Sequence, residues 1–320
     1  MMLQGIRKGE SDSESVGDDP LVPAAITDTG CERELNEDRY AVIECSSGLA
    51  WVVCDGMGGA MGGELAAQLA IDAIRRDLEN LPTRPIESAI KGAILEANRV
   101  IVLRRQNQAF ANMGTTVVAA MFSGSEVAIA HSGDSRAYLV RDSAIQQLTT
   151  DHTYVQDLVD KGKISFEEAL SHPQAHVLTR CIGSEPGLEV DTVKLYLWDL
   201  AEAEPVDYLL LCTDGLYSLV SDGEIANMVA SNSPQRACVL LTELARSRGG
   251  YDNITVAIIP IGGQLKNEPS QKAILFSEKP LAGKKDKSFR SQRVKIGVAL
   301  LAMSLLGILL AVLILMGVIG

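Results

Sequence analysis

Four short acidic turns contain the residue types best suited to chemistry in this chain of 320 residues. Three of them adjoin runs of apolar and β-branched residues, a pattern that predicts strands buried on both faces. A carboxylate at the end of a buried strand is costly unless a positive group meets it. Several converging carboxylates would form an oxygen-rich cage for hard divalent cations, which is the arrangement of a metallohydrolase site. The turns are Arg33-Glu34-Leu35-Asn36-Glu37-Asp38, Asp55-Gly56-Met57-Gly58-Gly59, Thr213-Asp214-Gly215 and Tyr251-Asp252-Asn253-Ile254-Thr255.

A hydrolytic site with two cations requires a bridging carboxylate, further carboxylates that fix each cation, and room for water. Asp55 is the natural bridge, because the glycines after it let the backbone approach an ion and offer a carbonyl. Asp214 and Asp252 could hold one ion and Glu37 the other. Because all of these ligands are oxygen atoms, Mg²⁺ or Mn²⁺ is favoured over Zn²⁺.

Each turn taken alone also has a purely structural interpretation, because Asp-Gly is a common turn sequence. The set is more specific, since the sequence offers no histidine or cysteine cluster with ligand spacing. Arg33 adds a guanidinium that can bind phosphate oxygens in a bidentate manner. The alternative is an ordinary surface arginine paired with Glu34 or Glu37.

The hydrophobic period indicates strands in runs and helices in pairs, which favours antiparallel sheets covered by helix pairs over a parallel doubly wound sheet. Helices are expected at residues 63–81, 86–106, 153–171 (interrupted near Gly162), 222–230 and 234–248. Strands are expected before residue 55 and at residues 115–122, 126–131, 136–140, 144–148, 190–197, 208–212 and 253–259.

Composition separates a folded domain, residues 21–261, from two unlike ends. Residues 1–20 are acidic and poor in apolar side chains, so we expect them to be disordered, and no apolar stretch near the start predicts a signal peptide. Residues 262–295 form a polar, basic linker. The net charge of -12 makes nucleic acid an unfavourable partner.

Residues 296–319 are uncharged and almost wholly aliphatic, and the segment is long enough to cross a bilayer as a helix. Basic residues before such a segment favour the cytoplasmic side and anionic lipid, although a solvated linker could carry the same charges. We therefore expect a single-pass protein of the cell membrane with its domain in the cytoplasm. The basic residues are Lys284, Lys285, Lys287, Arg290, Arg293 and Lys295.

The motifs in their order resemble those of the metal-dependent serine/threonine protein phosphatases of the PPM family (type 2C phosphatases), in the bacterial form. The similarity runs from about residue 24 to 259, and residues 151–180 look like the helical flap of that family. It rests on Arg33-x-x-Asn36-Glu37-Asp38, Asp55-Gly56-Met57-Gly58-Gly59, Gly114-Thr115-Thr116, Gly133-Asp134-Ser135-Arg136, Thr213-Asp214-Gly215-Leu216 and Asp252-Asn253-Ile254-Thr255.

The resemblance implies an α+β fold, a four-layer αββα sandwich of two antiparallel sheets flanked by helix pairs. It also implies two Mn²⁺ or Mg²⁺ ions at one end of the sandwich, and a third, looser ion. The implied roles are Asp55 as the bridge, Glu37 and the Gly56 carbonyl on one ion, Asp214 and Asp252 on the other, Asp134 with Asp214 on the third, Asp38 acting through a bound water, and Arg33 on the phosphate.

Two departures from the family pattern affect the chemistry. Met57 stands where animal members have a histidine that serves as general acid, and methionine donates no proton. Bacterial members share this Asp-Gly-Met-Gly-Gly form, so activity is still expected. Ala60 stands where bacterial relatives often have a histidine, and we expect a consequence for substrate approach more than for metal binding.

The expected function is therefore metal-dependent hydrolysis of phosphoserine and phosphothreonine in proteins, with a membrane serine/threonine kinase as the natural opposite partner. One alternative is a non-catalytic phosphoprotein-binding scaffold of the same fold, although no metal aspartate is missing. Another is a specialised phosphatase for a single regulator, such as an anti-anti-sigma protein.

Overall fold

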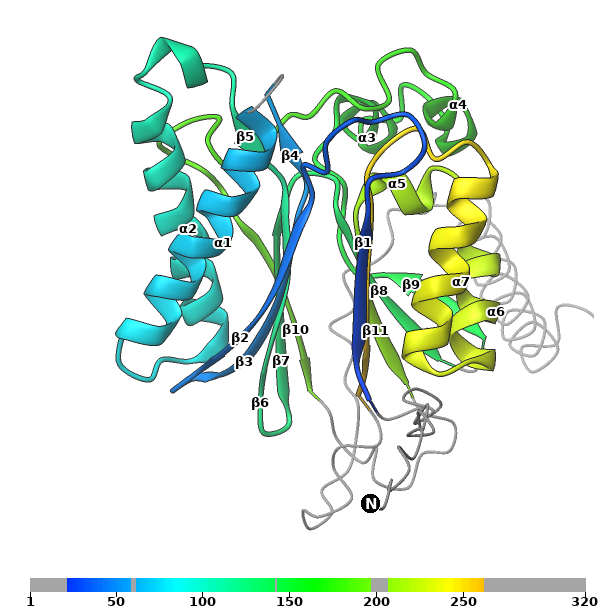
Figure 1. Ribbon diagram of the computed structural model, residues 1–320, viewed down its shortest axis with the longest axis horizontal. Coiled ribbons are helices and arrows are strands. Elements are labelled where there is room, and N and C mark those ends of the chain that lie inside the picture. The colour runs from blue at the N-terminus through cyan, green and yellow to red at the C-terminus, as the bar shows by residue number, and fades with distance from the viewer. Residues whose placement is uncertain (1–21, 59–61, 142, 197–206, 262–320) are drawn as a thin grey trace, which may run out of the picture. The chain divides into compact units, whose positions relative to one another are not determined.

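The computed structural model describes residues 22–58, 62–141, 143–196 and 207–261 (Figure 1). The expected acidic tail (1–20), linker (262–295) and transmembrane helix (296–319) lie outside these residues. Within the described ranges, no helix has the length and apolar character needed to cross a membrane.

Two five-stranded sheets face each other, and every pairing between neighbouring strands in their described residues is antiparallel. The first sheet has the order β1 (Ala24–Asp28), β12 (Ile254–Pro260), β11 (Tyr208–Cys212), β8 (Arg136–Arg141) and β9 (Ala144–Gln147). The second has the order β10 (Asp191–Tyr196), β7 (Glu126–Ser132), β6 (Val117–Ser123), β3 (Gly48–Cys54) and β2 (Arg39–Cys45).

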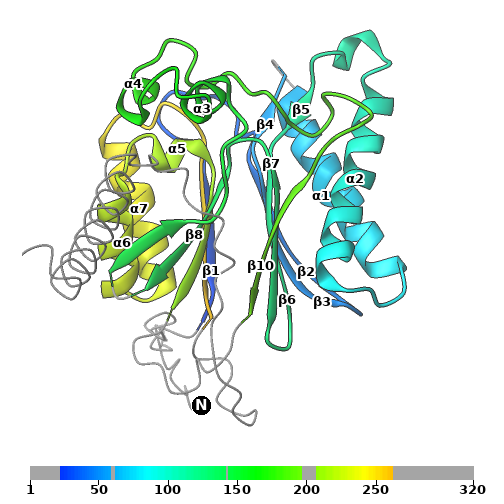
Figure 2. The same ribbon diagram turned by 180° about the vertical axis from the view of Figure 1, so that it is seen from behind.

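A helix pair covers the outer face of each sheet, as Figures 1 and 2 show. α1 (Gly62–Asn80) and α2 (Ile86–Arg104) pack on the second sheet, while α6 (Asp222–Ser231) and α7 (Pro234–Ser247) pack on the first. The helix ends follow local sequence, since Ser221 forms a capping box and Pro234 occupies the first turn of α7. The predicted α+β architecture of four layers is confirmed.

The central strands are buried on both faces because one face meets the opposite sheet and the other meets helices. All of β11 and β12 and five of the seven residues of β3 are buried. Between the sheets, Val53 and Ile129 of the second sheet belong to one apolar cluster with Leu211 and Ile259 of the first. This core holds the ends of the two sheets at a fixed separation.

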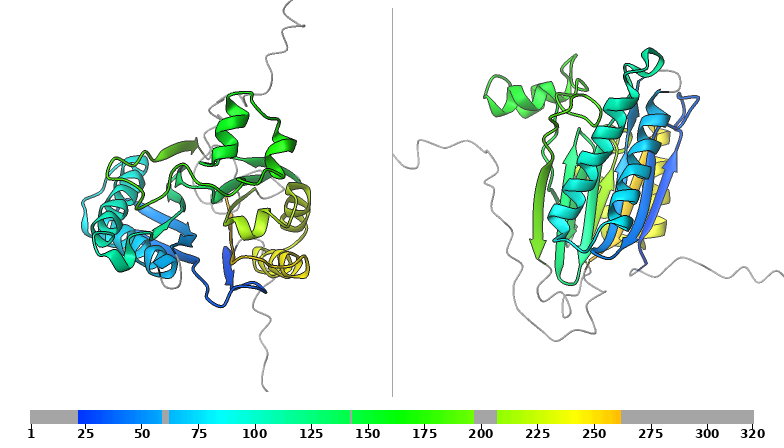
Figure 3. Two further views of the ribbon diagram at one scale, coloured as in Figure 1. Left: turned by 90° about the horizontal axis from the view of Figure 1, so that it is seen from above. Right: turned by 90° about the vertical axis from the view of Figure 1, so that its left-hand side faces the viewer.

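Several short elements at one end of the sandwich escaped sequence analysis. β4 (Gly56–Met57) pairs with β5 (Gly114–Thr115), and α5 (Asp214–Tyr217) directly follows β11. A one-turn 3-10 helix, Gln108–Phe110, follows α2. The expected interrupted helix is α3 (Tyr154–Asp160) and α4 (Phe166–Leu170). We call residues 151–180 the flap, and its green helices project beyond the sheets at this same end (Figure 3).

Candidate metal centre and active site

Chain direction explains why distant carboxylates meet at one end of the sandwich. Asp55 follows β3 and Asp214 follows β11. Asp38 precedes β2, which pairs antiparallel with β3, and Asp252 precedes β12, which pairs antiparallel with β11. Asp134 lies in the turn between β7 and β8. The four acidic turns predicted from the sequence therefore share one end of both sheets.

Asp38 is the most deeply buried of these acids, with 1 % of its surface exposed. Its Oδ2 accepts hydrogen bonds from Thr213 Oγ1 at 2.8 Å and Thr255 Oγ1 at 2.7 Å. Its Oδ1 is also buried and has no hydrogen-bond partner among the residues described. A buried carboxylate oxygen without a donor requires a counter-charge or a water molecule.

Close backbone packing places Glu37 beside Gly56. A Cβ atom on Gly56 would lie 2.1 Å from the carbonyl oxygen of Gly63, and a Cβ on Gly63 would lie 2.4 Å from Glu37 Oε1. Glycine is therefore required at both positions. The backbone of Asp55 is fixed by Thr116, whose N–H donates to the Asp55 carbonyl and whose hydroxyl accepts from the Asp55 N–H, at 2.8 and 3.0 Å.

The electrostatics of the cluster favour neutral acids when no cation is present. Burial, followed by repulsion from Asp38 and the other acids, raises the pKa of Asp55 well above its usual range. Burial and then Asp214 raise the pKa of Asp134 to about 8. Burial also raises the pKa values of Asp38, Glu37 and Asp252. Adding divalent cations would remove this penalty, because opposite charge stabilises ionised carboxylates.

The donor set therefore fits hard divalent cations. Asp214 Oδ1 is the second buried carboxylate oxygen that has no hydrogen-bond partner within the described part of the chain. With Asp38 Oδ1, two carboxyl oxygens without partners lie in a cluster whose possible ligands are all oxygen atoms, which Mg²⁺ and Mn²⁺ prefer.

Arg33 lies at the rim of the cluster with 49 % of its side chain exposed. Its Nη2 donates to Asp252 Oδ2 at 2.7 Å. This contact replaces the pairings with Glu34 or Glu37 that the sequence offered as alternatives. Because half of its side chain remains accessible, Arg33 can meet a phosphate that approaches the carboxylates.

Sequence reasoning missed two neighbours of these acids. His176 of the flap places Nδ1 3.5 Å from Asp214 Oδ2, and that carboxylate raises the pKa of His176. Tyr217 donates a hydrogen bond of 3.0 Å to the backbone carbonyl of Asp134, and Arg136 stacks on the Tyr217 ring at 3.6 Å. No sequence spacing signals these contacts, because each joins separate segments.

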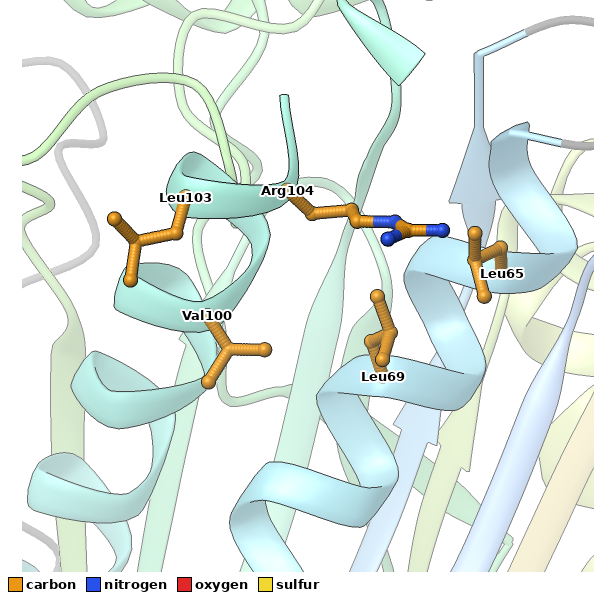
Figure 4. A pocket seen from close by; sticks show the side chains of 5 residues that line it. All are labelled: Leu65, Leu69, Val100, Leu103 and Arg104. Atoms are coloured by element: carbon orange, nitrogen blue, oxygen red, sulfur yellow. The ribbon is translucent and has the colours of Figure 1, made fainter. Parts of the chain in front are cut away.

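A separate apolar pocket of about 430 Å³ lies between α1 and α2 (Figure 4). Arg104 extends across it toward Leu65. No acid of the cluster contributes to its walls, so the pocket is distinct from the candidate metal centre. Its lining residues are Leu65, Leu69, Val100, Leu103 and Arg104.

A sandwich of this topology with a cage of acids at one end defines a class of metal-dependent hydrolases. The model of the family described as protein phosphatase 2C matches residues 32–246, so the chain belongs to the protein phosphatase 2C family. It is 39% identical over 241 residues to the serine/threonine phosphatase stp of Listeria welshimeri, and the match covers 73% of this chain and 93% of that protein.

Solved structures agree with this membership. The crystal structure of the Mycobacterium tuberculosis serine/threonine phosphatase PstP/Ppp superposes with a TM-score of 0.66 at 35% identity, covering 74% of this chain and 97% of that chain. The catalytic domain of PstP, solved in complex with two manganese ions, superposes with a TM-score of 0.62 at 34% identity. The match covers 74% of this chain and 96% of that chain.

Proposed function

We propose that this chain is a protein phosphatase that hydrolyses phosphoserine and phosphothreonine with the help of Mn²⁺ or Mg²⁺. The observation that carries the proposal is the convergence of Asp55, Glu37, Asp214 and Asp252 around the buried Asp38. Relatives named serine/threonine phosphatase and the PstP domain with two manganese ions support it.

In this proposal the residues keep the roles that the resemblance implies. Asp55 would be shared by two ions, Glu37 and the Gly56 carbonyl would hold one of them, and Asp214 and Asp252 would hold the other. Asp134 with Asp214 would hold a third. When bound, the ions supply Lewis acidity and lower the pKa of water at the site.

The remaining chemistry belongs to side chains of this chain. Arg33 exchanges its contact with Asp252 for oxygen atoms of the phosphate, which its planar guanidinium can bind in pairs. Thr213 and Thr255 occupy Oδ2 of Asp38, so Oδ1 remains to accept a hydrogen bond from water. Met57 offers no proton, so the leaving alkoxide takes its proton from water at the site.

Phosphate release from a phosphothreonine peptide tests the proposal. The full chain should release phosphate with Mn²⁺, stop with excess chelator, and lose about 100-fold or more in the Asp214→Asn variant, the scale expected for a group that fixes a catalytic ion. Asp72→Asn is the matched control, because Asp72 lies on the exposed surface of α1. A folded chain that binds Mn²⁺ and never releases phosphate would instead support the phosphoprotein-binding scaffold.

We also propose that residues 296–319 anchor the phosphatase in the cell membrane with its domain in the cytoplasm. The uncharged aliphatic segment and the basic residues before it support this. Phosphorylated proteins near the membrane, including a serine/threonine kinase, are then the accessible substrates. The full chain should sediment with membranes after an alkaline carbonate wash and a chain ending at residue 261 should not; recovery of both in the supernatant would contradict the anchor.

A further inference from the structure

A second polar cluster lies at the base of the flap, outside the carboxylate cage. It comprises His131, His152, Asp191 and Arg180. Ligand atoms of the two histidines and the aspartate lie within 4.8 Å of one another. The histidine rings are stacked with centroids 4.6 Å apart. Both histidines are buried, and burial lowers the pKa of each, to about 4 for His152.

The hydrogen bonds of this cluster argue against a metal site. His152 Nδ1 accepts the N–H of Gly133 at 3.1 Å, so its proton resides on Nε2. That protonated nitrogen lies 3.4 Å from Asp191 Oδ2 and has no lone pair for a metal. The rings are only 22° from parallel, which makes their nitrogen lone pairs poorly convergent. His152, Asp191 and Arg180 therefore form a network of hydrogen bonds. His131 joins it by stacking on His152, while its Nε2 bonds to the Thr150 carbonyl and its buried Nδ1 has no partner among the described residues.

This network joins both ends of the flap to the second sheet. Asp191 begins the edge strand β10. Its Oδ1 accepts from Arg180 Nη1 at 3.0 Å, and its Oδ2 faces His152. The chain segments around His152 and Arg180 are themselves paired, since the Thr179 N–H donates to the His152 carbonyl at 2.8 Å. A single carboxylate thus contacts the entering and the leaving segment of the flap.

The same network reaches the carboxylate cage. His152 and Gly133 are bonded twice, because the His152 N–H also donates to the Gly133 carbonyl at 3.0 Å. Gly133 immediately precedes Asp134 and has a φ of +112°, so its backbone conformation suits glycine alone. Farther along the flap, His176 contacts Asp214. The flap base is therefore bonded to the residue before one acid of the cage, and His176 of the flap contacts a second.

We propose that Asp191 is a positioning residue that fixes the flap over the carboxylate cage. Its ionised carboxylate is the acceptor that Arg180 and His152 share, and without it the two ends of the flap lose their common attachment to β10. The flap then opens, and phosphorylated polypeptides lose a wall of their binding site. A small phosphate ester that does not reach the flap is unaffected. Only this kinetic consequence rests on the proposed function.

Limited trypsin digestion of the full chain tests the attachment without reference to activity. Lys161 and Lys163 lie between the two flap helices and report flap opening. Cleavage there should be about tenfold faster in Asp191→Ala, the effect of losing about 1.4 kcal/mol of charge-assisted hydrogen bonding. Glu126→Ala is the matched control, because it breaks a 3.2 Å ion pair that joins Lys194 of the same strand, β10, to β7 and not to the flap.

Kinetics supply the second readout. Asp191→Ala should raise KM for a phosphothreonine peptide about tenfold, the same 1.4 kcal/mol, and leave kcat for p-nitrophenyl phosphate within about twofold. Asp191→Glu, which keeps the charge, should recover part of the loss. Unchanged cleavage and KM in a folded Asp191→Ala variant, or losses matched by Glu126→Ala, would overturn the proposal. If Asp191→Ala does not fold, Arg180→Gln carries the same two measurements.

The digestion test does not depend on phosphatase activity, so its result can be interpreted even if the chain releases no phosphate. Faster flap cleavage in an inactive protein would support the positioning role and contradict the proposed function alone. Equal cleavage of Asp191→Ala and wild type, in a protein that does release phosphate, would contradict the positioning role and support the proposed function.

Discussion

Thr213 and Asp38 are 175 positions apart in the chain, and a hydrogen bond of 2.8 Å joins the hydroxyl of one to the carboxylate of the other. Thr213 follows β11 of the first sheet, and Asp38 precedes β2 of the second. Thr255 of β12 donates to the same oxygen at 2.7 Å. These bonds connect the two sheets at the point where the acids meet, so the geometry of the cage depends on the packing of the whole sandwich.

Thr213→Val should therefore affect both stability and metal binding. Valine keeps the β-branched shape and removes the hydroxyl, which donates to Asp38 and accepts the N–H of Thr255 at 3.0 Å. A buried acceptor and a buried donor each lose a bond, at a cost of about 1–3 kcal/mol in the free energy of unfolding. Denaturant unfolding in chelator measures this change. Thr192→Val is the control, since its hydroxyl donates to the partly accessible Glu87. Equal costs for the two variants would contradict a special role of the bonds to Asp38.

Asp55→Asn should stabilise the metal-free protein and weaken its response to Mn²⁺. Asp55 is destabilised by burial and by the neighbouring acids, so a neutral amide relieves repulsion. A gain of about 1 kcal/mol would raise Tm by about 2–4 °C in a domain of this size. Thermal unfolding with chelator and with excess Mn²⁺ shows both effects. A lower Tm in chelator together with an intact Mn²⁺ shift would refute this reading of the cage.

Arg33→Lys should behave like Arg33→Ala in phosphopeptide kinetics. A lysine keeps the charge but lacks the planar fork that binds two phosphate oxygens. We expect KM to rise about tenfold or more in both variants, as for one lost charge-assisted contact of about 1.5–3 kcal/mol. Initial rates over a range of peptide concentrations provide the test. Wild-type KM in Arg33→Lys would show that charge alone suffices.

The buried His152 predicts a stability that decreases as the pH is lowered. Burial, then His131 and Arg180, lower its pKa in the folded protein from 6.5 to about 4, against the opposing effect of Asp191. The unfolded chain binds a proton between these values and the folded chain does not, so stability is lost as pH falls from 6.5 toward 4. Between pH 6.5 and 4, the free energy of unfolding should therefore fall by roughly 1–3 kcal/mol less in His152→Gln than in the wild type.

Denaturant unfolding in chelator at a series of pH values provides this measurement. His172→Gln in the flap is the control variant. A His152→Gln curve parallel to that of the wild type would mean that His152 does not contribute to the acid sensitivity.

The sequence was most informative where local patterns decide structure. The apolar runs before Asp55 and Asp214 predicted buried strands, and antiparallel order then required their ends to meet. α5 was missed because four residues show no helical period. The partners of Arg33, His152 and Asp191 were missed for another reason. Such contacts depend on the register between strands and on the path of the flap, neither of which leaves a periodic signal in one sequence.

Parallel titration of Mn²⁺ binding and phosphate release, on the wild-type chain and on Asp55→Asn, tests the central claim most directly. Calorimetry would give the binding curve and a phosphothreonine peptide the rate. If one cage of acids both binds the cations and performs hydrolysis, release rises as Mn²⁺ binds, and Asp55→Asn weakens both by about 100-fold or more. Full Mn²⁺-dependent release by Asp55→Asn, or release that persists in excess chelator, would contradict the account.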